Sequence, residues 1–350
     1  MDFSFYRGKT VLITGHTGFK GTWMSKVLAM YGAKVIGFAL RPPTTPSLFT
    51  LSEIEKEIYS VEGDIRDFSA LRAVFEEYRP EIVIHMAAQP IVRESYVDPV
   101  YTYETNVMGT VNLLEAARTV ECVHSLVNVT TDKVYRNNEW EWGYREIDPL
   151  DGYDPYSNSK SCSELVTSSY LRSFFRESGT SVSTCRAGNV IGGGDFAKDR
   201  IIPDCVRAMQ AGKTIGVRNP YSTRPYQHVL EPVCAYLQLA QCQYGDRKRY
   251  EGSYNVGPDD CDCVMTGDLV SLFCKHWGEG AAWENLAEKN APHEANFLKL
   301  DCSKIKNVLG WQPRWHIEDA IEKTVEWSRA YLAGENIISV MERQIGEYLK

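Results

Sequence analysis

Tyr156 and Lys160 stand four positions apart, and their side chains could together carry out acid–base chemistry at a hydroxyl group. On a helix this spacing puts both side chains on one face. A tyrosine hydroxyl has an ordinary pKa of about 10, which a neighbouring ammonium group lowers by favouring the phenolate. Such a phenolate can take the proton of a carbinol while hydride leaves for a bound acceptor. On spacing alone, however, a solvated helix face explains the pair better.

A second group of polar residues, Thr131, Asp132 and Lys133, ends a predicted strand. Parallel α/β sheets present catalytic side chains at the carboxyl ends of their strands. Thr131 can therefore hydrogen bond the same substrate hydroxyl as Tyr156. This placement favours a catalytic role for Tyr156 and Lys160 over a surface role.

Three glycines with the spacing G-x-x-G-x-x-G follow the first predicted strand and open a helix. Glycine permits the tight turn, the close approach of a pyrophosphate to the backbone and the close packing of helix on strand. The helix N-terminus attracts the anion. We therefore expect a nicotinamide dinucleotide here, bound by Gly15, Thr17, Gly18, Phe19, Lys20 and Gly21.

The end of the second predicted strand leaves the choice between NAD and NADP open. It carries no acidic residue for the ribose hydroxyls, and Arg41 could accept a 2′-phosphate. Asp64, after the third strand, is placed either to meet the adenine amino group or to cap a helix. The further expected cofactor contacts are Asp64, Ile65, Ala87, Ala88, Gln89, Asn106, Tyr156 and Lys160.

Strand-like and helix-like segments alternate through the first half of the chain, as is typical of βαβ units around a parallel sheet. The predicted strands are residues 10–14, 34–39, 81–86, 124–129 and 181–185, and one that ends at Glu62. Helices are predicted from the glycine turn to about residue 31 and over 68–78, 105–118 and 155–176. We expect an α/β protein with a Rossmann-type doubly wound parallel sheet over residues 1–186. Residues 187–350, interrupted by glycines and prolines, are expected to form a smaller mixed α/β substrate-binding domain, with some segments returning to the main sheet.

Composition and charge exclude several classes of protein. The net charge of −8 over 350 residues argues against a nucleic-acid or anionic-membrane partner. No apolar run reaches the length of about 18 residues that suggests a membrane span, and the first residues do not form a signal peptide. The ten cysteines are scattered, apart from Cys261 and Cys263, so we expect reduced thiols in the cytoplasm and no metal site.

Taken together, the motifs resemble those of the extended short-chain dehydrogenase/reductase family. Within that family the chain resembles the nucleotide-sugar 4,6-dehydratases over nearly its whole length. The resemblance rests on residues 15–21, 87–88, 131–133, 142–146, 154–160, 186–190 and 224–229. It implies NAD as cofactor and a nucleotide sugar as substrate. In the implied reaction Tyr156 takes the proton of the hydroxyl on carbon 4 of glucose as hydride leaves, water is lost across carbons 5 and 6, and hydride returns to carbon 6.

The resemblance assigns the elimination to Asp132 and Lys133. In relatives that act on dTDP-glucose the pair is Asp-Glu, where the aspartate protonates the departing hydroxyl and the glutamate removes the proton from carbon 5. Lys133 replaces that glutamate, as in the branch that acts on CDP-glucose, which becomes the expected substrate. A lysine with a lowered pKa could be the base, or a charged lysine could stabilise the enolate.

An acidic protein needs local cations to hold the pyrophosphate of a nucleotide sugar. The candidate substrate contacts are Arg93, Asn189, Lys198, Arg200, Arg218, Arg224 and His293. For the charged members, ordinary solvated surface is the alternative explanation. A homodimer joined through two long helices, or a homotetramer, is what the family implies.

Two other functions remain open from the sequence. A 4-epimerase shares the hydride step, but it needs no acid–base pair for elimination, so Asp132 and Lys133 favour dehydration. A nicotinamide-sensing scaffold without activity is disfavoured because Thr131, Tyr156 and Lys160 are all present.

Overall fold

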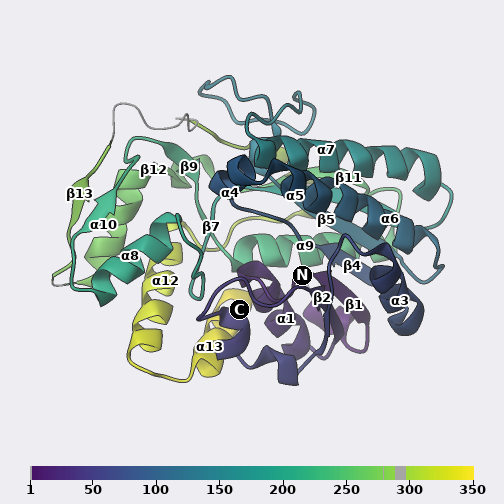
Figure 1. Ribbon diagram of the computed structural model, residues 1–350, viewed down its shortest axis with the longest axis horizontal. Coiled ribbons are helices and arrows are strands. Elements are labelled where there is room, and N and C mark those ends of the chain that lie inside the picture. The colour runs from purple at the N-terminus through teal and green to yellow at the C-terminus, as the bar shows by residue number, and fades with distance from the viewer. Residues whose placement is uncertain (1, 279, 288–296) are drawn as a thin grey trace.

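The computed structural model of the protein describes residues 2–278, 280–287 and 297–350. Its centre is a sheet of seven strands in the order β11-β6-β5-β4-β1-β2-β3 (Figure 1), and every pair of neighbours is parallel. The strands are β1 (Thr10–Thr14), β2 (Lys34–Ala39), β3 (Tyr59–Glu62), β4 (Ile82–His85), β5 (Ser125–Thr131), β6 (Ser181–Ala187) and β11 (Gly252–Val256). Strands β4, β5 and β6 are buried along their whole length, as expected for a parallel sheet covered on both faces.

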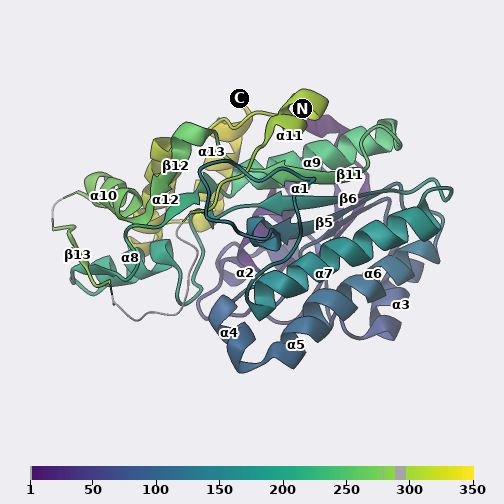
Figure 2. The ribbon, with the colours of Figure 1, turned by 90° about the horizontal axis from the view of Figure 1, so that it is seen from above.

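Helices cover both faces of the sheet (Figure 2). One face carries α3 (Phe68–Tyr78), α6 (Gly109–Arg118) and α7 (Pro155–Tyr170). The other carries α1 (Phe19–Met30), α9 (Leu230–Gly245) and α13 (Ile337–Leu349). Three short helices, α2 (Leu48–Leu51), α4 (Val92–Val97) and α5 (Pro99–Tyr103), lie in the connections. The predicted Rossmann-type doubly wound sheet is confirmed.

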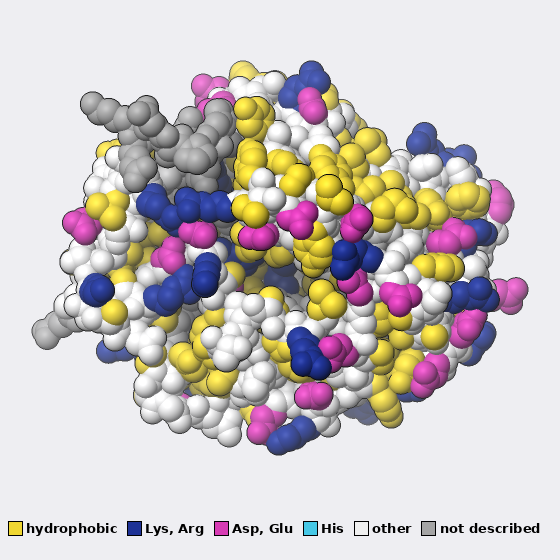
Figure 3. Space-filling model, viewed as in Figure 1, with side chains coloured by type: hydrophobic (Ala, Val, Ile, Leu, Met, Phe, Trp, Pro, Cys, Tyr) yellow, Lys and Arg dark blue, Asp and Glu magenta, His cyan; other side chains and the backbone are white. Residues whose placement is uncertain are grey.

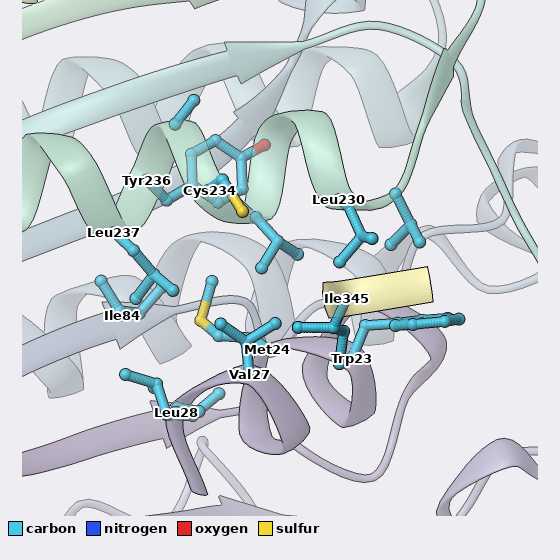
Figure 4. Close-up of a cluster of buried hydrophobic side chains, with 14 of the residues drawn as sticks. Trp23, Met24, Val27, Leu28, Ile84, Leu230, Cys234, Tyr236, Leu237 and Ile345 are labelled. Atoms are coloured by element: carbon cyan, nitrogen blue, oxygen red, sulfur yellow. The ribbon is translucent and has the colours of Figure 1, made fainter. Parts of the chain in front are cut away.

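An apolar cluster holds α1 against the sheet and beside α9 (Figure 4). Trp23, Met24 and Val27 of α1 are fully buried against Leu230 and Leu237 of α9. Burying a large apolar side chain contributes about 1.5–3 kcal/mol. The cluster therefore holds the N-terminus of α1, and the glycine turn before it, in a fixed position at the end of β1.

The second half of the chain builds a second lobe with its own apolar core, which includes Ile202, Cys205, Leu269, Phe273 and Ile321. Its helices are α8 (Ile201–Gln210), α10 (Thr266–Trp277) and α12 (Ile317–Leu332), whereas α11 (Ser303–Leu309) packs against β11 and α9. Its short strands are β7 (Val190–Ile191), β8 (Ile215–Val217), β9 (Thr223–Pro225), β10 (Gln227–His228), β12 (Cys263–Met265) and β13 (Trp283–Asn285). The same half also supplies β11, α9 and α13 to the main sheet, and a division near residue 186 stays a prediction.

The structure shifts several predicted boundaries. Strands β5 and β6 each run two residues farther than predicted, so Thr131 and Ala187 are paired at the carboxyl edge of the sheet. The helices predicted over 105–118 and 155–176 are each interrupted by a π-helical turn, at residues 104–108 and 171–175. Such turns are often found at functional sites, and the first one carries Asn106.

No described helix has the length and apolar character needed to cross a membrane. All ten cysteines lie in the described part of the chain and all are free thiols.

Candidate active site

Thr131 links two groups that can transfer protons. Its hydroxyl donates a hydrogen bond of 3.0 Å to Oδ1 of Asp132 and also acts on the hydroxyl of Tyr156, whose pKa it lowers. Tyr156 lies in the first turn of α7, which begins at Pro155 and is capped by the side chain of Asp154. Proline and aspartate are favoured at these two positions. The start of α7 thus brings Tyr156 to the end of β5.

Tyr156 is buried, and burial raises the pKa of its hydroxyl to about 12. The positive charge of Arg200 and the bond to Thr131 act in the opposite direction. A phenol in this state needs more positive charge nearby before it can serve as a base at neutral pH.

Lys160 lies one turn farther along α7 and is only 4% exposed. Its ammonium group donates a hydrogen bond of 3.2 Å to the backbone oxygen of Val129 in β5. Burial, together with the charge of Lys20, lowers the pKa of Lys160 to about 7, while Glu164 opposes the shift. The predicted pair of Tyr156 and Lys160 is therefore placed on the face of α7 that meets the sheet.

Lys20 faces the same centre from the first turn of α1. Burial is the main cause that lowers the pKa of its ammonium group to about 8, and Arg200 adds to the shift. The carboxylates of Asp132 and Asp195 act in the opposite direction. The sequence predicted Lys20 only as a cofactor contact, because its neighbours across the site come from distant segments.

Asp132 is 2% exposed, and its second carboxylate oxygen, Oδ2, has no hydrogen-bond partner among the described residues. Burial raises the pKa of this carboxyl group, while Lys133, Thr131 and Arg224 partly oppose the shift. A raised pKa favours the protonated form, which can donate a proton. Lys133 is adjacent to it and partly exposed.

The glycine turn is shaped by close backbone contacts. Gly15 has a left-handed φ of +79°, and a Cβ there would lie 2.8 Å from the backbone nitrogen of Ala87 at the end of β4. A Cβ on Gly21 would lie 2.2 Å from the backbone oxygen of Gly15. Gly18 is the N-cap of α1 and has no side chain that could cap the helix. The backbone amides at the start of α1 are therefore not covered by an N-cap side chain. This is the setting that a pyrophosphate requires.

Other predicted cofactor residues surround this turn. The hydroxyl of Thr17 donates to the backbone oxygen of Leu40 at 2.9 Å, and Phe19 begins α1. The backbone nitrogen of Gln89 donates to Oδ1 of Asn106 at 2.8 Å, and Nδ2 of Asn106 donates to Ser159 at 2.9 Å. These bonds join the end of β4 to the start of α7. Ala87 and Ala88 are half-buried beside them.

The region expected to meet adenosine contains two ion pairs. Asp64 binds the guanidinium group of Arg66, with a shortest distance of 2.7 Å, and this contact lowers the pKa of Asp64. Asp67, not Asp64, caps α3, so the cap alternative for Asp64 is wrong. Ile65 is buried beneath α6, and Arg41 pairs with Glu62 at 3.0 Å.

The predicted substrate residues lie mainly around the region between α4 and α8, where Lys and Arg side chains gather beside a hollow (Figure 3). Arg93 and Arg218 both contact Asp199. Arg200 pairs with Asp195 at 2.9 Å, and Lys198 is exposed on the same segment.

Arg224 is buried, and its charge lowers the pKa of Asp132. The backbone oxygen of Asn189, between β6 and β7, accepts a bond from Gln227 at 3.0 Å. His293 lies outside the described residues.

A buried ion pair one helical turn beyond Lys160 was not predicted. Arg186 lies 2.8 Å from Glu164, and both side chains are at most 3% exposed. The hydroxyls of Thr130 and Thr184 also donate to Glu164, at 2.5 and 2.6 Å. Glu164 follows Lys160 by one helical turn, which was the only signal in the sequence. The pair fixes α7 on β5 and β6.

Comparison with known proteins shows to which family the chain belongs. Residues 12–324 match the GDP-mannose 4,6 dehydratase family. The chain is 48% identical to CDP-glucose 4,6-dehydratase of Salmonella typhimurium strain LT2, with 100% of this chain and 98% of that relative covered. A solved UDP-glucose 4-epimerase of Thermus thermophilus in complex with NAD is similar with a TM-score of 0.79 and 25% identity, covering 91% of this chain and 99% of that one. A solved dTDP-glucose 4,6-dehydratase of Bacillus anthracis in complex with NAD shares the fold, with a TM-score of 0.77, 23% identity and coverage of 95% and 100%. The chain therefore belongs to the GDP-mannose 4,6 dehydratase family.

Proposed function

We propose that this protein is an NAD-dependent CDP-glucose 4,6-dehydratase, which converts CDP-glucose to CDP-4-keto-6-deoxyglucose and water. The contact between Thr131 and Asp132 carries the proposal, because it sets a buried acid with one unpartnered oxygen beside Tyr156. The 48% identity to the Salmonella CDP-glucose 4,6-dehydratase supports this choice of substrate.

The residues around the glycine turn fit NAD. The left-handed Gly15, the tight contact at Gly21 and the uncapped start of α1 leave the backbone open to a pyrophosphate. The similarity to solved structures in complex with NAD supports NAD over NADP. When bound, NAD supplies the hydride acceptor that carbon 4 needs and the hydride donor that carbon 6 needs.

Tyr156 removes the proton from the hydroxyl on carbon 4, and Thr131 orients that hydroxyl. Arg200 and Thr131 partly oppose the rise in the pKa of the phenol that burial causes. Lys160, on the same face of α7, adds positive charge when it is protonated, which favours the phenolate. Lys160 is held by the backbone oxygen of Val129, so its charge stays in place.

The ketone at carbon 4 makes the proton on carbon 5 acidic. Lys133, with its amine uncharged, accepts the proton from carbon 5, and the electron pair of that carbon–hydrogen bond expels the oxygen on carbon 6. Asp132 gives its proton to that oxygen, which leaves as water. The raised pKa of Asp132 keeps this proton available.

Cations from both lobes hold the diphosphate of the substrate. Arg93 reaches from α4, Arg218 follows β8 and Arg224 lies in β9. Lys198, Arg200, Asn189 and His293 complete the proposed contacts.

The decisive test is an incubation of the protein and NAD with CDP-, dTDP-, UDP- or GDP-glucose, scored by NMR for the 4-keto-6-deoxy sugar. We expect product from CDP-glucose at a kcat/KM well above that of the other three. Equal use of all four substrates would show that the protein does not select the cytosine base. If none of the four gives product, the proposed function is wrong.

A 4-epimerase is the alternative that the fold supports, given the similarity to the solved UDP-glucose 4-epimerase. Run in deuterium oxide, a dehydratase incorporates deuterium at carbon 5 of its product. Inversion at carbon 4 without deuterium at carbon 5 would identify an epimerase instead.

A cytoplasmic dimer completes the proposal. Apolar side chains are exposed on the short helices and on α7, where Val97, Val100 and Leu165 are 77%, 67% and 57% exposed. Two copies that pack these surfaces together would cover them. Light scattering should report a dimer or tetramer, and Leu165→Glu should shift it towards the monomer.

A further inference from the structure

One carboxylate holds two of the arginines that we assign to the substrate diphosphate. Oδ1 of Asp199 lies 3.1 Å from both Nη1 and Nη2 of Arg218, and 3.3 Å from Nη1 of Arg93. Arg93 stands on α4, beside the main sheet, whereas Arg218 directly follows β8 of the second lobe. Asp199 therefore binds one cation from each lobe, in the region where basic side chains gather (Figure 3).

The backbone of Asp199 is set for this contact. Its φ of +59° is left-handed, a conformation that aspartate and asparagine tolerate better than most other residues. The next residue, Arg200, begins the turn into α8 and is held by Asp195 at 2.9 Å. Arg200 also acts electrostatically on Tyr156. The carboxylate thus lies one residue away from a group that acts on the proposed catalytic tyrosine.

The contact is solvent-exposed and can be exchanged. The side chains of Arg93, Arg218 and Asp199 are 59%, 48% and 39% exposed. Exposed ion pairs of this kind contribute little to stability, because water and salt screen them. The diphosphate of a nucleotide sugar carries one negative charge on each of two phosphoryl groups, and arginine binds such groups with strong, paired hydrogen bonds. It can engage both arginines at once, where Asp199 offers a single oxygen.

We propose that Asp199 is a built-in competitor for the substrate diphosphate: its carboxylate occupies the place between Arg93 and Arg218 and leaves when the nucleotide sugar binds. This inference rests on the proposed function, which supplies the diphosphate. In the free enzyme the carboxylate keeps both guanidinium groups turned towards each other. The product carries the same diphosphate as the substrate, so the return of Asp199 to the arginines assists product release.

The test is Asp199→Asn, which removes the charge and keeps a residue that accepts the left-handed backbone. We expect the Kd for inorganic pyrophosphate, measured by titration calorimetry, and the KM for CDP-glucose to fall about threefold to tenfold. In an Arg218→Met background the same substitution should give a much smaller gain, because one of the two competing contacts is gone.

The opposite sign would overturn the inference. If Asp199 only ties the two lobes together in their active arrangement, Asp199→Asn will raise KM or lower kcat and will not tighten pyrophosphate binding. Asp246→Asn is the matched control, since it removes one exposed carboxylate at the end of α9 and should change neither constant.

Failure of the two proposals can be told apart. Tighter pyrophosphate binding by Asp199→Asn, without turnover of any nucleotide-glucose by the wild type, would reject the dehydratase and keep the competitor. Turnover of CDP-glucose by the wild type, with unchanged pyrophosphate affinity in the variant, would reject the competitor alone.

Discussion

The charge of Lys20 acts on Lys160 and adds to burial in holding the pKa of the Lys160 ammonium group at about 7. Lys20 is itself held at a pKa of about 8. A buried lysine and a half-buried lysine of like charge destabilise the folded protein, because both lose water and the charge of Lys20 opposes that of Lys160. A chain selected for stability alone would not keep both, so their cost indicates a role in binding negative groups or in acid–base chemistry.

Lys160→Met should therefore stabilise the NAD-free protein at pH 7 while abolishing activity. The folded state binds fewer protons than the unfolded state between the folded pKa of about 7 and the ordinary lysine pKa of 10.5, so the wild type gains stability as pH rises through this range. We expect a gain of a few kcal/mol for the variant at pH 7 that shrinks towards pH 9.5, measured by urea unfolding. The control is Lys213→Met at an exposed site. If the variant is less stable than the wild type at both pH values, the inference that burial of the Lys160 charge destabilises the folded protein is wrong.

Tyr156→Phe should lower kcat by about 10²- to 10⁴-fold, because the group that takes the hydroxyl proton is lost. The phenyl ring fills the same buried space, so NAD affinity by calorimetry should stay close to that of the wild type. A loss of NAD affinity with a normal kcat would mean that Tyr156 binds the cofactor and does not transfer the proton.

Asp132→Asn should separate oxidation from elimination. Asparagine keeps the acceptor for the hydroxyl of Thr131 but cannot give a proton to the departing oxygen. We expect rapid-quench mass spectrometry to show a nucleotide-linked 4-ketoglucose that still contains its oxygen on carbon 6. In Lys133→Met we expect the same ketone to accumulate and, in addition, no exchange of deuterium at carbon 5. Normal elimination in Asp132→Asn would assign the acid to another group.

Arg186→Met should destabilise the fold by about 3–5 kcal/mol, because it leaves the buried carboxylate of Glu164 without its cation. The measurement is the midpoint of urea unfolding. Adding Glu164→Gln should recover part of the loss, since the uncompensated charge is then gone. If the single variant unfolds like wild type, the pair is not what holds α7 on the sheet.

The sequence predicted the main sheet well because its strands are short apolar runs that alternate with longer helical segments. Once β5 and α7 were identified, Thr131, Tyr156 and Lys160 had to meet at the carboxyl edge. The partners of charged residues were not predictable in this way. Glu164 and Arg186 pair only because α7 packs over β6, and the contact of Asp199 with Arg93 and Arg218 depends on a left-handed residue that no local pattern marks.

Strand β11 prevents a clean division of the chain into two independently folding halves. It pairs with β6, yet it is reached only after the chain has passed through much of the second lobe, and α9 joins the same core from that half. A fragment cut at residue 186 would leave the edge of β6 unpaired and an apolar face uncovered, and we expect it to aggregate. We therefore expect that the second half of the chain cannot be exchanged between relatives as one independent segment. Changes in the second lobe are therefore expected to arise by substitutions within it, not by exchange of the whole segment.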